Sequence, residues 1–421
     1  MAPLRVHGTV HVPGDKSISH RALLLAALAE GDSSIRGILV SSDVAATASV
    51  LREMGVELAP LSVQVHVRGC GVRGLSAPGA PLECGNSGTT ARLVAGIVAG
   101  HPFSATLVGD ASLSRRPMQR VARPLQAMGA LVEFASSDGL PMTVHGGPLR
   151  AIDWILETPT AQVKSAILLA ALVGGVRATI RGGGRSRDHT ERMLAAIGAN
   201  LLTDAASVTI EPTEDLMPLD MDVPGDASSA AYFAGLAAIA DEGDIDLPGV
   251  GLNPTRTAFL ELLRAMGANV TTTVRNEAAG EPVGTVRVAR GDLRGVTIPA
   301  DDVTELLDEL PLIACLGAVA AGETRVTGAG ELRFKESDRI AMTVSNLRAL
   351  GADAEELPDG FVVRGSDRPL AGRVTTGGDH RIAMAFGVLA RRFGSAVSVD
   401  DRSCVAVSYP EFWDDLHRVS A

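Results

Sequence analysis

The chain has 421 residues, which is too long for one ordinary domain and predicts two. Hydrophobic residues make up 46% of it but aromatic residues only 3%, so the core must be built from Ala, Val, Leu and Ile. A formal net charge of −11 excludes binding to nucleic acid or to an anionic membrane by bulk attraction. Any anion-binding site must therefore be formed by a local cluster of basic side chains.

The four cysteines, Cys70, Cys84, Cys315 and Cys404, lack the spacing of a metal site and are too few for a disulfide framework. They predict small buried side chains in a reducing, cytoplasmic setting. No stretch reaches the roughly 20 apolar residues that cross a bilayer, so no membrane association is expected.

The first informative segment runs from Gly14 to Arg21 (GDKSISHR) and leads into an apolar octet over residues 22–29. Basic residues before an apolar stretch can mark a signal peptide, but the strand-like, alternating valines before this segment and its acidic residue argue against that. The pattern predicts a strand followed by a helix, with Asp15, Ser17 or Ser19 as the helix cap.

One pattern occurs five times along the chain: an apolar helix end, a glycine and then a strand. The glycines recur at intervals of roughly 70 to 85 residues, longer than the period of common solenoids. They are Gly55, Gly129, Gly198, Gly267 and Gly351. Each predicts a left-handed residue that closes a helix, a geometry that costs glycine little.

A second recurring element is a short alternating strand between two glycines, at residues 31–37, 175–182, 243–249 and 322–328. Helices and strands therefore interleave in units of about 70 residues. A sixth unit is expected to end near residues 412–416, which makes three units in each of two closed α/β domains. The alternative is that these matches arise by chance and not from a repeat, because helix–glycine–strand joints occur in many α/β proteins.

Lysine is rare in this chain. Only three of the 38 basic residues are lysines, namely Lys16, Lys164 and Lys335. A chain that otherwise uses arginine can keep lysine where a compact point charge is needed. Lys16 and Lys335 lie in dense polar segments beside apolar helices and are candidate anion ligands. Lys164 lies in AQVKSAILLAAL, which reads mostly as helix, so a structural position is the favoured interpretation.

Two further segments predict anion binding. Residues 85–92 (GNSGTTAR) form a small-residue loop that opens a helix, where backbone N–H groups attract an oxyanion; a plain tight turn is the alternative. Residues 112–120 (SLSRRPMQR) carry three arginines, whose forked donors suit carboxylate and phosphate. A solvated basic face is the alternative for that segment.

Acidic residues in the second half are candidate proton carriers. Asp308 and Glu309 lie in the segment DELPL, and Glu336 lies in KESDR. Carboxylates beside basic residues are more often simply ion-paired, which is the alternative for each. Residues 379–381 (DHR) follow a Gly-Gly turn and open another helix.

Together these segments resemble 5-enolpyruvylshikimate-3-phosphate synthases, and the match runs nearly end to end. The matching stretches are GDKSISHR, GNSGTTARL, GDASLSRRPM, TAQVKSA, SRDHTERML, PGDASSAAYF, DELPL, KESDRIA and DHRIAMAF. The resemblance implies transfer of the enolpyruvyl group of phosphoenolpyruvate to the 5-hydroxyl of shikimate 3-phosphate, with release of phosphate, in chorismate and aromatic amino acid biosynthesis. It implies neither a cofactor nor a metal.

The resemblance also implies the enolpyruvyl transferase fold, an inverse α/β barrel of two domains with three βαβαββ-type units each. One domain is expected to span residues 15–224 as an insertion. The other is expected to combine residues 1–14 and 225–421, with the active site in the cleft between the two domains. Pro-Gly-Asp triplets at 13–15 and 224–226 then mark the two crossings.

The matching motifs also imply the roles of single residues. The expected shikimate 3-phosphate ligands are Lys16, Ser17, Arg21, Thr160, Ala161, Gln162, Ser186, Arg187, Asp308 and Lys335. The expected phosphoenolpyruvate ligands are Lys16, Asn86, Gly88, Arg116, Gln162, Arg339 and Arg381. Asp308 is expected to take the hydroxyl proton, with Lys16 sharing that role, and Glu336 to exchange protons with the methylene carbon.

One departure from the family pattern concerns a cation. Val407 stands where the commonest members carry a lysine in a Thr-Ala-Lys-like stretch. A divergent, often glyphosate-tolerant branch also lacks that lysine, and DASLSRRPM and AQVKSA resemble that branch. Tolerant members often carry alanine at the place of Gly88, so this chain is expected to leave room for glyphosate and to be inhibited by it.

Two other functions fit the same scaffold. The sister enolpyruvyl transferase that acts on UDP-N-acetylglucosamine commonly carries a reactive cysteine in the loop matching residues 112–117, where this chain has none. A non-catalytic anion-binding protein would tolerate loss of the proton carriers, whereas Asp308 and Glu336 are both present. The residues therefore favour the shikimate 3-phosphate enzyme, which we expect to be a cytoplasmic monomer.

Overall fold

The computed structural model describes residues 3–183 and 186–420, and the chain divides into two compact units. The inserted unit comprises Gly14–Val223 and Glu277–Glu281. The flanking unit comprises Met1–Pro13, Pro224–Asn276 and Pro282–Ala421. Residues 277–281, which we expected in the second domain, thus group with the first.

The inserted unit alternates helices with short strands. Its helices are α1 (Lys16–Leu28), α2 (Ser42–Glu53), α3 (Gly88–Ala99), α4 (Gln119–Met128), α5 (Ala161–Gly174) and α6 (His189–Ala196). Its strands are β2 (Glu30–Arg36), β3 (Glu57–Leu58), β4 (Gln64–Cys70), β5 (Leu82–Glu83), β6 (Ser104–Val108), β7 (Leu131–Phe134), β8 (Met142–His145), β9 (Ile152–Ile155), β10 (Ala178–Arg181), β11 (Leu201–Thr203), β12 (Ser207–Ile210) and β13 (Asp220–Asp222).

The sheets of the inserted unit repeat one topology. Their strand orders are β13-β2-β4-β3, β5-β6-β8-β7 and β9-β10-β12-β11. In each sheet the first pair is parallel and the other two pairs are antiparallel. Side chains of β4 alternate between exposed and buried over its first five residues, so one face of its sheet faces the core.

The flanking unit uses the same elements. Its helices are α7 (Ala227–Ile239), α8 (Ala258–Ala265), α9 (Ala300–Val303), α10 (Leu310–Gly317), α11 (Arg339–Ala349), α12 (His380–Phe393) and α13 (Phe412–Val419). Its strands are β1 (Arg5–Thr9), β14 (Glu242–Gly251), β15 (Asn269–Ala278), β16 (Glu281–Ala289), β17 (Thr297–Ile298), β18 (Glu323–Val326), β19 (Asp353–Leu357), β20 (Gly360–Arg364), β21 (Gly372–Val374) and β22 (Val397–Val399).

The sixth repeat is shorter than the other five. The sheets β1-β14-β16-β15 and β17-β18-β20-β19 have the full set of strands, whereas β21 and β22 form only a parallel pair among the described residues. After β22 the chain makes a 3-10 turn (Ser403–Val407) and enters α13 instead of forming a hairpin. The expected end of the sixth unit, at residues 412–416, lies within α13.

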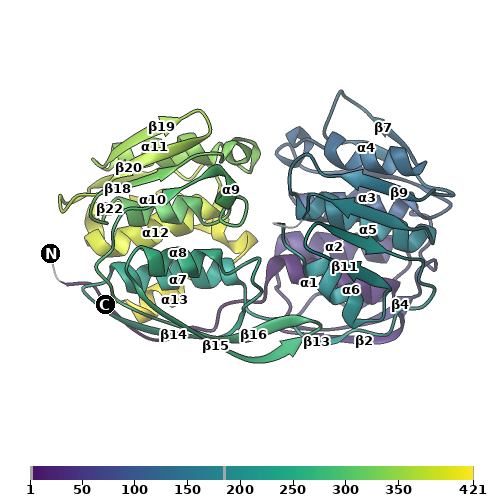
Figure 1. The fold of residues 1–421 in the computed structure, drawn as a ribbon, viewed down its shortest axis with the longest axis horizontal. Coiled ribbons are helices and arrows are strands. Elements are labelled where there is room, and N and C mark those ends of the chain that lie inside the picture. Colours follow the sequence, from purple (N-terminus) through teal and green to yellow (C-terminus); the bar gives the residue numbers. More distant parts are fainter. Residues whose placement is uncertain (1–2, 184–185, 421) are drawn as a thin grey trace. The chain divides into compact units, whose positions relative to one another are not determined.

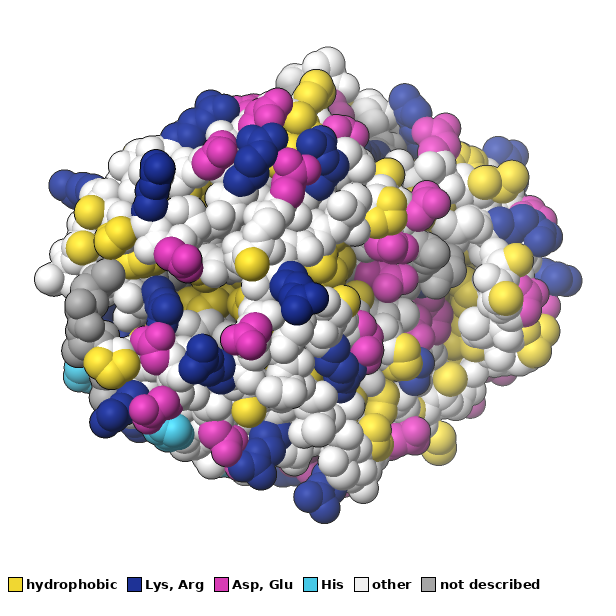
Figure 2. Space-filling view, turned by 60° about the vertical axis from the view of Figure 1, so that its left-hand side comes forward, with side chains coloured by type: hydrophobic (Ala, Val, Ile, Leu, Met, Phe, Trp, Pro, Cys, Tyr) yellow, Lys and Arg dark blue, Asp and Glu magenta, His cyan; other side chains and the backbone are white. Residues whose placement is uncertain are grey.

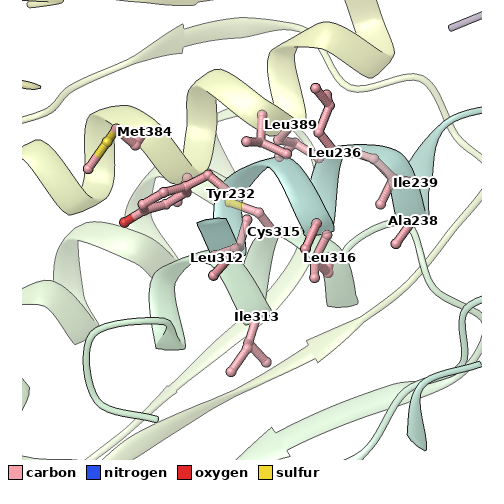
Figure 3. Close-up of a cluster of buried hydrophobic side chains, with 14 of the residues drawn as sticks. Tyr232, Leu236, Ala238, Ile239, Leu312, Ile313, Cys315, Leu316, Met384 and Leu389 are labelled. Carbon is pink, nitrogen blue, oxygen red and sulfur yellow. The ribbon is translucent and has the colours of Figure 1, made fainter. Parts of the chain in front are cut away.

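Three helices form the centre of the flanking unit. Helices α7, α10 and α12 pack side by side (Figure 1). Figure 3 shows Tyr232 and Leu236 of α7, Cys315 and Leu316 of α10, and Leu389 of α12 in one buried cluster. The core is thus largely aliphatic, as the composition predicts, and Cys315 takes part as a small buried side chain.

The predicted helix ends are confirmed. The five repeated glycines all have positive φ, from 89° at Gly55 to 114° at Gly129. A residue with a Cβ is strained in that conformation, so each glycine can close its helix and redirect the chain into a strand. At the other end of α1, Asp15 is the cap, because its Oδ1 accepts a hydrogen bond from Ile18 N at 2.9 Å.

Side-chain contacts explain why residues 277–281 group with the inserted unit. His189 Nδ1 of α6 lies 2.8 Å from Glu281 Oε1, and both side chains are almost fully buried. Arg192 Nη1 donates to the Gly280 carbonyl oxygen at 3.1 Å. This grouping could not be expected from sequence, because 92 residues separate the two members of the buried pair.

Charges on the surface are mixed in sign. Figure 2 shows Lys and Arg side chains interspersed with Asp and Glu on one face of the molecule. Arg364, for example, lies within ion-pair distance of Glu323, Asp353 and Glu355. Within residues 3–183 and 186–420, no helix is long and apolar enough to cross a membrane.

Candidate active site

Lys16 is the first residue of α1, and an ion pair holds its side chain. Lys16 Nζ lies 3.2 Å from Asp43 Oδ2 of α2, and both side chains are mostly buried. The ammonium is thereby kept at the amino end of α1, where the helix dipole also favours an anion. Ser17 follows in the same turn and is half-buried.

Arg21, one turn further along α1, is buried among neutral oxygen atoms. Its guanidinium donates to the Ser17 carbonyl oxygen at 2.9 Å, to Thr190 Oγ1 at 2.7 Å and to Ser165 Oγ at 2.9 Å. Burial lowers the pKa of Arg21 to about 10, because the charged form is poorly solvated there. The charges of Glu191 and Asp15 oppose this shift without cancelling it, so a bound anion would add countercharge that the hydrogen-bond partners do not supply.

Gln162 lies in the first turn of α5, after the capping position Thr160 and the first helical residue Ala161. Its Oε1 accepts from Arg92 Nη1 at 2.8 Å, and its Nε2 donates to Thr89 Oγ1 at 3.0 Å. Both ends of the amide are therefore oriented by α3.

Gly88 begins α3 in the small-residue loop. Ser87 caps this helix by accepting a hydrogen bond from Thr90 N at 3.1 Å. A Cβ atom at position 88 would lie 2.6 Å from Arg92 Nη1, so an alanine there would displace the guanidinium that holds the Gln162 amide. The absence of a side chain at Gly88 thus keeps the amino end of α3 accessible to an anion.

Arg116 is held by the same loop. Its Nη2 donates to Asn86 Oδ1 at 2.5 Å, and Asn86 Nδ2 donates to Asp110 Oδ2 at 2.6 Å. The Asn86 amide therefore links the Arg116 guanidinium to the Asp110 carboxylate.

Ser186 is buried beside the amino end of α6. Its Oγ donates to the Gly183 carbonyl oxygen at 2.7 Å, and its own carbonyl oxygen accepts from Lys164 Nζ at 3.3 Å. Arg187 is the next residue, and its charge adds to the lowering of the Arg21 pKa that burial mainly causes. Arg187 and Arg21 are therefore within electrostatic range of one another.

In the flanking unit, Arg339 is surrounded by carboxylates. Its nitrogens lie 2.9 Å from Asp379 Oδ2, 2.6 Å from Glu336 Oε2 and 3.5 Å from Asp308 Oδ1. Burial alone would lower the pKa of Arg339, but the three carboxylates outweigh it and raise the pKa. We call Arg339, Asp308, Glu336 and Asp379 the Arg339 cluster.

The three carboxylates of the Arg339 cluster differ in exposure. The Asp379 side chain is fully buried, whereas Asp308 and Glu336 keep 18% and 26% of theirs exposed. Asp379 also accepts from Ser337 Oγ at 2.9 Å and caps α12 through Arg381 N at 2.9 Å. Asp379 can therefore serve as a fixed countercharge, while Asp308 and Glu336 can reach a ligand.

Arg381 and Lys335 add positive charge around Asp308. Arg381 Nη2 lies 3.7 Å from Asp308 Oδ2, and the Asp308 charge helps to raise the pKa of Arg381 against the effect of burial. Burial lowers the pKa of Lys335, and the charge of Asp308 opposes that shift. The structure thus brings together Asp308, Glu336, Lys335, Arg339 and Arg381, which the sequence predicted only as separate candidates.

Glu309, the neighbour of Asp308, faces the interior. Its carboxylate accepts a hydrogen bond from Ser228 Oγ, which in turn accepts from Arg256 Nη2 at 2.7 Å. Burial raises the pKa of Glu309, with a further contribution from the charge of Asp308. This buried network and the role of Asp379 were not expected from the sequence. The one available signal was the Gly-Gly-Asp segment before α12, which is typical of a helix cap.

Val407 ends the 3-10 turn that precedes α13, and its side chain is half-buried. No charge can come from this position, as the sequence indicates. Lys335, Arg339 and Arg381 are the basic residues that act on Asp308 among the described contacts of this unit.

Known proteins match this chain along nearly its whole length. The family model described as "EPSP synthase (3-phosphoshikimate 1-carboxyvinyltransferase)" matches residues 1–416. A 3-phosphoshikimate 1-carboxyvinyltransferase of Acidithiobacillus ferrooxidans is 47% identical over 410 residues, which cover 97% of this chain and 94% of that protein. The 3-phosphoshikimate 1-carboxyvinyltransferase of Alkalilimnicola ehrlichii is 48% identical over 409 residues, which cover 97% of this chain and 92% of that protein.

Solved structures agree with these matches. An EPSP synthase from Acinetobacter baumannii superposes with a TM-score of 0.87 at 37% identity, covering 99% of this chain and 96% of that one. The enolpyruvyl transferase NikO from Streptomyces tendae superposes with a TM-score of 0.76 at 18% identity, which shows the shared fold alone. The fold is therefore the enolpyruvyl transferase fold, and the chain is a transferase that belongs to the EPSP synthase (3-phosphoshikimate 1-carboxyvinyltransferase) family.

Proposed function

We propose that this chain transfers the enolpyruvyl group of phosphoenolpyruvate to the 5-hydroxyl of shikimate 3-phosphate. The observation that carries the residue assignment is the Arg339 cluster. One buried guanidinium holds two partly exposed carboxylates, Asp308 and Glu336. The reaction needs a proton removed from a hydroxyl and a proton moved at carbon, and two carboxylates can divide that work.

The inserted unit would bind shikimate 3-phosphate. Arg21 supports this role because its hydrogen bonds within the described residues go to neutral oxygens, and the charges of Glu191 and Asp15 only partly offset the effect of burial on its pKa. A phosphate dianion suits such a group. The proposed ligands in this unit are Lys16, Ser17, Arg21, Thr160, Ala161, Gln162, Ser186 and Arg187.

Phosphoenolpyruvate would be held by cations and by the amino end of α3. Arg116, Arg339 and Arg381 suit its carboxylate and phosphate, and the backbone at Gly88 can approach an oxyanion closely. Gln162 is oriented for a polar contact by Arg92 and Thr89. Asn86 acts through Arg116, whose guanidinium it holds.

The proposed reaction has two steps. In the first step, the 5-hydroxyl oxygen of shikimate 3-phosphate bonds to carbon 2 of phosphoenolpyruvate, and Asp308, assisted by Lys16, takes the hydroxyl proton. Glu336 protonates carbon 3 in the same step. Glu336 then takes a proton back from carbon 3 as the carbon–oxygen bond to phosphate breaks, which restores the double bond. Cationic side chains stabilise the charge on the departing phosphate. Lys335 would bind shikimate 3-phosphate beside Asp308.

Three further properties belong to this proposal. Glyphosate, an anion that would compete with phosphoenolpyruvate, should inhibit the enzyme because Gly88 adds no side chain to the loop. The four cysteines are all free thiols, which suits a cytoplasmic protein. We also propose that the protein is a monomer, which size-exclusion chromatography with light scattering would test.

Phosphate release tests the function directly. Purified protein should release phosphate from phosphoenolpyruvate when shikimate 3-phosphate is supplied and should not when UDP-N-acetylglucosamine replaces it. Release only with the nucleotide sugar would assign the protein to the sister reaction. Binding of shikimate 3-phosphate without release from either acceptor would indicate an anion-binding protein.

A further inference from the structure

Lys164 is a buried lysine for which the proposed reaction has no use. It lies on α5, where the residue is only 3% exposed. Its Nζ lies 2.6 Å from Glu191 Oε1 of α6 and donates to the Ser186 carbonyl oxygen at 3.3 Å. An ammonium group is costly to bury unless it is paired and hydrogen-bonded, and both conditions are met here.

The residues next to this ion pair hold Arg21. Ser165 follows Lys164, and Thr190 precedes Glu191 in the chain. The two hydroxyl oxygens lie 2.6 Å apart, and each accepts a hydrogen bond from Arg21. Two adjacent interactions therefore join α5 and α6: the Lys164–Glu191 ion pair and the Ser165–Thr190 hydrogen bond. The two hydroxyl groups also orient the Arg21 guanidinium.

The same lysine also holds Ser186. The Lys164 side chain lies against Gly183, where an added Cβ would be 3.1 Å from Lys164 Cδ. Ser186 is hydrogen-bonded to the Gly183 carbonyl oxygen through both its backbone N at 2.9 Å and its Oγ at 2.7 Å. Lys164 therefore contacts Gly183 through its aliphatic stem and Ser186 through its ammonium group.

We propose that the Lys164–Glu191 ion pair is a positioning device for the shikimate 3-phosphate site. It fixes the spacing of α5 and α6 so that Ser165 and Thr190 orient Arg21, and it fixes the backbone at Ser186. Lys164 does not bind the substrate itself, because it is buried and its ammonium already has two partners. The inference rests on the proposed roles of Arg21 and Ser186 in binding this substrate.

Substitutions of the pair separate positioning from stability. Lys164→Met removes the charge and keeps the aliphatic stem, and Glu191→Gln keeps the shape of the partner. Lys164→Met with Glu191→Met replaces the whole pair by apolar side chains of similar size, a change that buried ion pairs often tolerate. Arg181→Met and Asp153→Asn are matched controls, because these residues form an exposed ion pair in the same unit.

The measurements are the Kd of shikimate 3-phosphate by calorimetry, the KM of phosphoenolpyruvate at saturating shikimate 3-phosphate, and the Tm. We expect Lys164→Met, Glu191→Gln and the double variant to weaken shikimate 3-phosphate binding at least roughly tenfold, the loss of about one charged hydrogen bond. The KM of phosphoenolpyruvate should stay within about twofold, and the controls should match the wild type.

The double variant tests the positioning role even if Lys164→Met fails to fold, because it leaves no buried charge without its partner. A double variant with a wild-type Tm that still binds shikimate 3-phosphate weakly supports the positioning role. Wild-type affinity in the double variant would overturn it, and so would an equal loss for both substrates. The proposed function is judged separately, by phosphate release from the wild-type enzyme and by the affinity of Arg21→Met for shikimate 3-phosphate.

Discussion

Two buried arginines, one in each unit, have opposite surroundings. In the inserted unit, Arg21 donates to two hydroxyls and a carbonyl oxygen, and burial lowers its pKa. In the flanking unit, Arg339 meets three carboxylates that raise its pKa against the effect of burial. A buried cation with neutral partners favours an incoming anion, whereas a neutralised cation orients the carboxylates around it.

This difference suggests a division of labour between binding and proton transfer. The hydrogen-bond partners of Arg21 are neutral, so its interaction energy with an anionic ligand should appear as affinity. Arg339 already has its countercharge, so its removal should damage the protein even without a ligand. Asp308 and Glu336, which it holds, are the groups placed to move protons.

The largest expected effect concerns the Arg339 cluster. Arg339→Met leaves Asp308, Glu336 and the fully buried Asp379 without their shared cation. We expect the free energy of unfolding to fall by about 3–5 kcal/mol, the usual result of stranding buried charge. Urea unfolding of the ligand-free protein measures it. Arg364→Met, at an exposed arginine that also faces carboxylates, is the control and should leave the midpoint unchanged.

Arg21→Met should affect ligand binding more than stability. Ser165 and Thr190 can keep their mutual hydrogen bond after the guanidinium is lost. We expect binding of shikimate 3-phosphate to weaken by about 1.5–3 kcal/mol, which corresponds to a Kd roughly 10- to 150-fold higher. Calorimetry measures the affinity and thermal unfolding the stability. A loss of stability as large as that of Arg339→Met would remove the contrast between the units.

A smaller effect is expected from Gly88→Ala. The new Cβ would lie 2.6 Å from Arg92 Nη1, but this atom is the end of a flexible side chain that can move. The cost should therefore be near the low end for overpacking, about 1 kcal/mol. The KM of phosphoenolpyruvate should rise about fivefold, with a larger rise in the inhibition constant of glyphosate. Unchanged inhibition by glyphosate would count against its proposed contact with this loop.

The smallest effect is expected from Val407→Lys, which adds a cation to the flanking unit. The position is half-buried, and a single added ion pair contributes about 0.2–1 kcal/mol. The KM of phosphoenolpyruvate should therefore fall by no more than about fivefold, whereas the Kd of shikimate 3-phosphate should not change. A change confined to shikimate 3-phosphate would show that position 407 serves the other substrate. Val407→Met is the matched neutral control.

Sequence alone predicted much of the fold, because its signals are local. The five helix-closing glycines are visible as a repeat, and each has the left-handed backbone that the pattern predicts. Asp15 was among three possible caps, and only the structure shows that it accepts the bond from Ile18 N. The shortened sixth repeat was not predicted. The sequence pattern does not show whether the hairpin strands of this repeat are absent or only differ in sequence from those of the other repeats.

The site was predicted as segments and not as contacts. Motifs indicated Asp308, Glu336 and Arg339 as site residues. Neither the hydrophobic periodicity nor the spacing of these residues in the sequence could show that the Arg339 guanidinium contacts both carboxylates. The sequence indicates a structural lysine on a helix at Lys164, but its partner Glu191 lies on a different helix. Such pairs depend on how helices pack, which sequence periodicity does not specify.

Glu336→Gln tests the division between binding and proton transfer most directly. The amide keeps the size of the side chain but cannot exchange a proton with carbon 3. We predict an unchanged Kd for shikimate 3-phosphate and a kcat for phosphate release that falls by about 10²–10⁴-fold. A weakened Kd that accounts for the lost turnover, or a kcat close to the wild-type value, would contradict the account.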